Sequence, residues 1–194
     1  MDTPLSIPME AGDSQHLRHA GDYTIANCER RIEQGRAGMN KRALTIAIVT
    51  PLGCAIFGNA LVGDAVKTWY PSLKKSSVIL PIWAFIPVAI ANYLMCGAIL
   101  YRLLALVAPS RQRTSAIVLL LSMMGANEGW NYLFFGWKSL RASLGGMLGF
   151  IFLTIALYHA LNQIDRRSAM ILRPYLAWLG YDVVWAEELW RLNR

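Results

Sequence analysis

Two segments of the chain repeat polar and aromatic residues at helical spacing. The first set, spaced 3-1-3, comprises Asn127, Trp130, Asn131 and Phe134. The second set, spaced 3-4-3, comprises Tyr175, Trp178, Asp182 and Trp185. Residues three or four apart share one face of an α-helix, so each set predicts a single face. Rings for stacking beside amide and carboxyl groups are typical of a pocket for a flat, partly polar aromatic ligand. Aromatic packing with hydrogen-bonded amides between helices is the alternative.

Two acidic residues, Asp182 and Glu128, fall within apolar stretches. A charged side chain is costly in the middle of a membrane helix, so such a residue needs a partner or a function. No lysine or arginine lies at the depth expected for either acid. The sequence leaves two interpretations open, a functional role or a satisfied structural pair, and in the second Asn127, Asn131 or water holds Asp182.

Long apolar helices must hold these residues in place. Hydrophobic residues make up 55% of the 194 residues and charged residues 16%, whereas soluble domains average about 25% charged. Five mainly apolar stretches are long enough to cross a bilayer as a helix, which takes roughly 20 residues. They are residues 43–63, 78–101, 115–137, 142–162 and 169–190. We therefore predict an all-α integral membrane protein, with residues 43–194 forming a bundle of five transmembrane helices.

The basic residues predict the orientation of this bundle. With five spans, twelve of the 19 lysines and arginines fall on the side of the N-terminus and seven on the other. This bias follows the positive-inside rule and predicts a multi-pass protein with a cytoplasmic N-terminus. Topology thus accounts for the net charge of +7 without a nucleic-acid partner. Residues 1–42 are polar and lack periodicity, which predicts a disordered cytoplasmic tail.

The depth of each residue follows from a rise of 1.5 Å per residue. Ala89 and Asn92 fall near the middle of the second span, and the two aromatic faces lie at similar depth or further outward. The longest connection, residues 64–77, would cover them on the outer side. Lys74 and Lys75 in this connection are expected to reach an acidic group of the ligand.

Glycine pairs occur at small-xxx-small spacing in two spans, as Gly125 with Gly129 and Gly145 with Gly149. This spacing allows helices to approach closely. We expect the pairs to pack within the bundle, and a homodimer interface is the alternative. No catalytic triad, phosphate loop or metal-ligand cluster is visible, so we predict no catalytic residue, metal or cofactor.

Four motifs combine aromatic with small or polar residues: WYPSLKK at 69–75, NxxWxxxFFG at 127–136, PYLAW at 174–178 and LWRLN at 189–193. Together they resemble the family of the tryptophan-rich sensory protein (TspO) and the translocator protein. The motifs occur in the family's order, and the resemblance covers about residues 45–193. It implies a five-helix membrane receptor, often a homodimer, that binds porphyrins and in some members cholesterol or synthetic ligands. By position, Asn127, Trp130 and Trp178 match pocket residues of the family.

The chain departs from the family pattern at functional positions. Ala89 replaces a pocket tryptophan, which argues against the porphyrin photodegradation of some members. Asp182 replaces a small residue, and Glu187 with Glu188 replaces the aromatic pair of the proposed cholesterol motif. The leading prediction is thus a receptor for a porphyrin or another flat hydrophobic ligand. A small-molecule or proton-coupled transporter comes second and a porphyrin-degrading enzyme third.

Overall fold

The computed structural model describes residues 40–77 and 79–194. Most of the predicted tail, residues 1–39, and Val78 at the start of the second predicted span lie outside the described residues. Five long helices make up most of the described chain: α2 (Lys41–Val62), α4 (Phe85–Ala105), α5 (Arg111–Asn131), α6 (Leu140–Ile164) and α7 (Arg166–Leu192). The described residues contain no strand, so the predicted all-α class is confirmed.

Short helical segments connect some of the long helices. Between α2 and α4 lie α3 (Ala65–Thr68), η1 (Tyr70–Ser72) and η2 (Ile82–Ala84). At its end, α5 continues into a single π-helical segment, η3 (Tyr132–Gly136). Three long helices begin at capping residues whose side chains accept a hydrogen bond from a backbone N–H three positions later. These residues are Asn40, Ser110 and Ser139.

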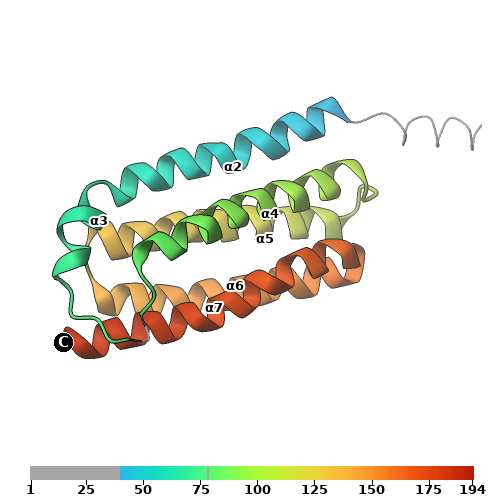
Figure 1. The fold of residues 1–194 in the computed structure, drawn as a ribbon. Coiled ribbons are helices and arrows are strands. Elements are labelled where there is room, and N and C mark those ends of the chain that lie inside the picture. Colours follow the sequence, from blue (N-terminus) through green and yellow to red (C-terminus); the bar gives the residue numbers. More distant parts are fainter. Residues whose placement is uncertain (1–39, 78) are drawn as a thin grey trace, which may run out of the picture. The chain divides into compact units, whose positions relative to one another are not determined.

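The long helices of residues 40–194 run antiparallel to their chain neighbours and form a closed ring (Figure 1). Around this ring α2 contacts α4, α4 contacts α7, α7 contacts α6, α6 contacts α5, and α5 returns to α2. A further contact between α4 and α5 crosses the ring. The connection from α2 to α4, the start of α6 and the end of α7 therefore lie at one end of the bundle.

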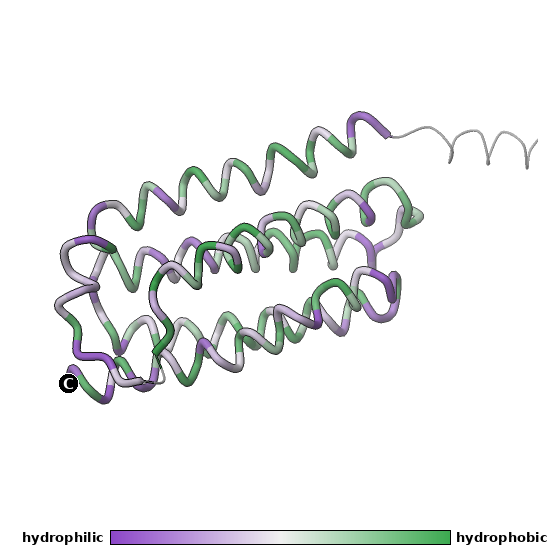
Figure 2. Tube along the Cα trace, viewed as in Figure 1, coloured by the Kyte–Doolittle hydropathy of each residue, from purple (hydrophilic) through white to green (hydrophobic). Residues whose placement is uncertain are grey.

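Three helical segments are long and apolar enough to cross a membrane: Lys41–Val62, Ile82–Ala105 and Leu140–Ile164. Figure 2 shows hydrophobic residues along the helices and hydrophilic residues mainly where the helices are joined. Large apolar side chains on α2 point outward, and Ile56 is 66% exposed. A soluble protein rarely exposes contiguous apolar surface of this kind, whereas lipid covers it at no cost. The fold is that of a membrane protein.

The close approaches between helices do not involve the glycine pairs that the sequence indicated. A Cβ atom added at Gly125, Gly129, Gly145 or Gly149 would meet nothing within 4 Å. The prediction that these pairs pack closely within the bundle was wrong, because no atom of a neighbouring helix comes within 4 Å of these positions. A Cβ at Gly97 of α4, by contrast, would lie 2.8 Å from the Ala47 carbonyl oxygen of α2.

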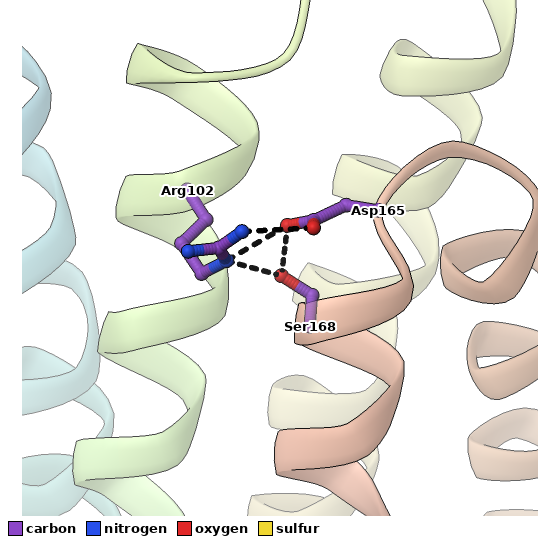
Figure 3. Close-up of polar contacts among 3 residues, drawn as sticks. All are labelled: Arg102, Asp165 and Ser168. Atoms are coloured by element: carbon purple, nitrogen blue, oxygen red, sulfur yellow. Dashed lines mark hydrogen bonds and ion pairs between the residues drawn. The ribbon is translucent and has the colours of Figure 1, made fainter.

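A charged cluster joins α4 to the start of α7 at the end of the bundle away from the 63–81 connection (Figure 3). Arg102 donates from Nε to Asp165 Oδ2 and from Nη2 to Asp165 Oδ1, both at 2.8 Å. The Ser168 hydroxyl donates to Asp165 Oδ2 at 2.6 Å. Burial alone would raise the pKa of the Asp165 carboxyl, but the hydrogen bonds from Arg102 and Ser168 outweigh burial and lower it. The cluster therefore stabilises the bundle as a charged pair.

Candidate ligand-binding site

A cavity of about 160 Å³ lies among α4, α5, α6 and α7. Its lining is mostly aromatic and aliphatic, with a few amide groups and one carboxyl group. Eight of the eleven residues predicted for the site line it: Ala89, Asn92, Asn127, Trp130, Tyr175, Trp178, Asp182 and Trp185. The structure thus brings together residues from three helices that are more than thirty positions apart in the sequence.

The other three predicted residues do not line the cavity. Phe134 is fully buried behind its wall, and Lys74 and Lys75 belong to the connection that covers the end of the bundle. Lys75 Nζ donates to the Tyr70 carbonyl oxygen at 2.6 Å and to the Leu73 carbonyl oxygen at 3.1 Å. It also lies 4.5 Å from the centre of the Tyr70 ring. Lys75 therefore holds the connection in shape and does not reach into the cavity.

The wall on the α5 side is a rigid stack of rings. Trp130 and Phe134 lie nearly parallel, with ring centres 5.1 Å apart and an angle of 9° between the planes. Trp185 packs against both rings from α7, at 5.8 Å and 5.1 Å between ring centres. Trp130 Nε1 donates to the Ser143 carbonyl oxygen of α6 at 3.0 Å. This hydrogen bond fixes the indole, so Trp130 presents a preformed surface to the cavity.

The π-helical segment at the end of α5 explains why Phe134 lies behind the wall. Its hydrogen bonds run between residues five apart, as from the Trp137 N–H to the Tyr132 carbonyl at 2.8 Å, so the side chains turn relative to an α-helix. Phe135 lines the cavity in place of Phe134. The ring centres of the two phenylalanines lie 4.8 Å apart at 85°. The prediction placed the aromatic residue one position too early.

Several lining residues were not predicted, among them Phe85 and Tyr93 of α4 and Phe150 of α6. Phe85 and Tyr93 lie four residues before and after Ala89, so the helical spacing that selected the α5 and α7 faces would have found them. Phe150 belongs to α6, a helix in which the sequence showed no face of repeated polar and aromatic residues. The ring of Phe85 lies 5.6 Å from that of Trp178 and 5.2 Å from that of Trp185, and these rings close one side of the cavity.

The connection between α2 and α4 covers this end of the bundle. Tyr70 is 3% exposed, and its ring stacks on Trp185 with 6.3 Å between centres. The Asn193 side chain accepts a hydrogen bond from the Lys74 N–H at 2.9 Å and donates to the Lys74 carbonyl oxygen at 3.0 Å. The connection is therefore tied to the C-terminal end of α7. It lies over the site as the depth argument predicted.

The two acids within the predicted spans, Glu128 and Asp182, occupy separate environments. Glu128 is 3% exposed and accepts hydrogen bonds from Tyr93 at 2.8 Å, Asn127 at 3.1 Å and Asn131 at 3.0 Å. These donors satisfy both of its carboxyl oxygens. Asp182 is 9% exposed, and its Oδ1 atom has no hydrogen-bond partner among the described residues. Glu128 thus fits the structural interpretation, whereas Asp182 lacks a hydrogen-bond partner for one of its two oxygens.

A ring of membrane-length helices around a small aromatic cavity, with a covering connection, defines an α-helical multi-pass membrane protein with an internal site. The chain belongs to the TspO/MBR family, whose sequence profile matches residues 47–191. It is 29% identical to the tryptophan-rich protein TspO of Chlorobaculum tepidum over 146 residues, which cover 74% of this chain and 92% of that protein.

Two further relatives are similar to this chain over most of their length. Protein CrtK of Rhodobacter capsulatus is 27% identical over 155 residues, covering 78% of this chain and 94% of that protein. The human translocator protein is 26% identical over 152 residues, covering 78% of this chain and 89% of that protein. The similarity spans all five long helices, so the family relationship extends to the whole bundle and confirms the resemblance drawn from the motifs.

Proposed function

We propose that this protein is a membrane receptor that binds a flat hydrophobic ligand of the porphyrin type in the cavity among α4 to α7. The observation that carries this proposal is the arrangement of the Trp130 and Trp178 rings with the Asn92 and Asn127 amides around one covered space. Rings supply stacking surface, and a few fixed polar groups set the orientation of a ligand. Family membership supports the same class of function.

The size of the cavity means that a tetrapyrrole enters only if the helices move apart. Pockets for drug-sized ligands measure roughly 300–1,000 Å³, compared with about 160 Å³ here. A groove of about 370 Å³ between α4 and α7 shares Val88, Asn92, Tyr175 and Trp178 with the cavity lining. Pro174 borders this groove and removes one backbone hydrogen bond from α7. We infer that α4 and α7 separate along this line to admit the ligand.

The test is titration of the purified protein with protoporphyrin, read by quenching of tryptophan fluorescence. Saturable quenching is expected, with affinity at least about tenfold weaker in Trp178→Ala because a stacking surface is lost. Trp137→Ala is the matched control, since Trp137 is 62% exposed and lies outside the cavity. If both variants bind as wild type does, the ligand binds elsewhere.

Five membrane crossings with a cytoplasmic N-terminus form the second part of this proposal. Helices α5 and α7 have 21 and 27 residues, long enough for a hydrocarbon core of about 30 Å. Their acids Glu128 and Asp182 are buried inside the bundle, away from lipid. Reporter fusions after Arg42 and after Arg194 should report the cytoplasm and the opposite compartment, respectively. The same compartment for both would rule out an odd number of crossings.

A small-molecule or proton-coupled transporter is the second candidate function. The two buried acids favour it, because intramembrane carboxyl groups commonly mark ion and proton pathways. Flux of protoporphyrin into proteoliposomes, coupled to a pH gradient, would support transport over sensing. A porphyrin-degrading enzyme is the third candidate, and Ala89 on the cavity wall offers no indole for that chemistry.

A homodimer is the oligomeric state that we propose. Gly145 and Gly149 leave open space on one face of α6, where a second copy or lipid would fit. Light scattering from the protein in nanodiscs gives the mass of the assembly, and a monomer would contradict the proposal.

A further inference from the structure

Asp182 is the one charged side chain among the described residues that line the cavity. It is nine-tenths buried, and its Oδ1 atom accepts no hydrogen bond from the described protein. Buried acceptors are almost always satisfied, so an exception calls for a partner from outside the chain. Glu128, with its three donors, shows that this bundle can satisfy a buried acid with its own side chains. The Oδ1 atom of Asp182 is therefore available to a donor from a ligand, while the Trp178 side chain interacts with the same carboxyl group.

Aromatic rings surround this carboxyl group. Trp178 and Trp185 lie one turn before and one turn after Asp182 on α7, and Phe85 contacts both of them from α4. All three rings line the cavity. The faces of aromatic rings attract cations, most strongly where water is excluded. A carboxylate within such a group of rings is suited to an organic ammonium ion.

The lining disfavours an anionic ligand group. It contains no lysine, arginine or histidine among its described residues, and Lys75 is engaged by backbone carbonyl groups of the covering connection. An acidic group placed beside Asp182 would meet a like charge in a largely buried site. The part of the cavity beside Asp182 thus disfavours a carboxylate group of a ligand.

The volume of the cavity limits the size of a ligand that fits without helix movement. A cavity of about 150 Å³ in another protein holds benzene, and the cavity here measures about 160 Å³. One aromatic ring with a short substituent therefore fills the closed site.

We propose that the closed cavity binds a small aromatic ammonium ion, whose ring lies among Phe85, Trp178 and Trp185 and whose N–H group donates to Asp182 Oδ1. This inference rests on the proposed function only because both use the same cavity. It assigns a cationic class of ligand to that cavity, and binding of such a ligand does not require α4 and α7 to separate.

The experiment uses the full chain in nanodiscs and ¹⁹F NMR of two ligands of nearly equal size. 4-Fluorobenzylammonium carries the positive charge and 4-fluorobenzyl alcohol is its neutral counterpart; empty nanodiscs correct for partition into lipid. Wild-type protein should bind the ammonium ion saturably and at least about tenfold more tightly than the alcohol, because charge-assisted hydrogen bonds are about twice as strong as neutral ones. Equal affinities would overturn the proposal.

Two isosteric variants locate the effect. Asp182→Asn keeps the shape of the side chain and should remove the preference for the ammonium ion while the alcohol still binds. Glu187→Gln makes the same change of charge on an exposed position of α7, outside the cavity, and should leave the preference intact. An undiminished preference in Asp182→Asn, or its loss in Glu187→Gln, would show that the local carboxylate is not responsible.

Protoporphyrin quenching in the same preparations separates this inference from the proposed function. If protoporphyrin binds and the two fluorinated ligands bind equally, the cationic site is wrong and the proposed receptor function stands. If the ammonium ion binds through Asp182 and protoporphyrin does not, the site is confirmed and the porphyrin assignment fails. If nothing binds, both are refuted.

Discussion

Replacing Gly58 with alanine tests the contact between α2 and the hydrogen-bonded Glu128. Gly58 is buried, and a Cβ atom built there overlaps the Glu128 carboxyl group and lies 3.2 Å from the Asn131 amide nitrogen. Either the carboxyl group rotates and loses hydrogen bonds, or α2 moves away from α5. Each hydrogen bond of this kind contributes about 1–3 kcal/mol. We therefore expect Gly58→Ala to lower the free energy of unfolding by about 3 kcal/mol.

The assay is thermal unfolding in nanodiscs, followed by tryptophan fluorescence. A loss of this size corresponds to a decrease in Tm of about 10 °C for a chain of this length. Gly53→Ala on the same helix is the control, because a Cβ atom there meets nothing within 4 Å. Its Tm should stay unchanged or rise slightly, since alanine favours helix by up to about 1 kcal/mol over glycine.

A double-mutant cycle identifies the clash as the cause. In a Glu128→Ala background the space opposite Gly58 is empty, so Gly58→Ala should cost almost nothing there. The reasoning is refuted if Gly58→Ala melts like Gly53→Ala, or if its cost is the same with and without the Glu128 side chain.

Two further predictions concern pH and light. The pKa of Asp165 is below its ordinary value of 3.8 in the folded protein, so the carboxylate stabilises the fold above that pH and the stabilisation is lost as pH falls through the folded pKa. Asp165→Asn should thus lower the free energy of unfolding at neutral pH by about 2 kcal/mol, which is measured as a lower Tm. The difference in Tm from wild type should shrink below pH 3.8. A difference that stays constant with pH would contradict this. Under illumination, wild-type protein should leave bound protoporphyrin largely unconverted, while Ala89→Trp should increase conversion measured by absorbance. Rapid conversion by wild type would show that an indole at this position is unnecessary.

Helical spacing predicted the inner face of α7 because this helix is regular where it lines the cavity. Trp178 and Asp182 follow the ordinary turn of the α-helix, and across the cavity they meet Ala89 and Asn92 of α4, which were predicted from their depth. The same spacing failed for Phe134, because a π-helical segment changes the hydrogen-bond pattern after Asn131. Residue spacing contains no indication of that change.

The level of a residue along its helix was predictable, but its direction around the helix axis was less so. Glu128 and Asp182 both lie within apolar stretches, but the sequence does not show that Glu128 turns toward Gly58 and Tyr93. The prediction for the glycine pairs failed for a similar reason. Their spacing shows that another helix can approach closely, but it does not show on which side a neighbouring helix lies. The path of the 63–81 connection depends on contacts with Asn193, which is far away in the sequence.

The paired hydrogen bonds of Asn193 have a consequence for which substitutions the chain tolerates. The Asn193 amide bonds only with backbone atoms, the N–H and C=O groups of Lys74 and the carbonyl oxygen of Leu189. An amide that both donates to and accepts from the backbone of one residue acts as an additional peptide group. Its hydrogen bonds therefore do not depend on the side chain of that residue. Position 74 can thus carry any side chain except that of proline, which lacks the N–H group, while the tether persists. Position 193 is restricted to a side chain with the length and two-sided bonding of asparagine.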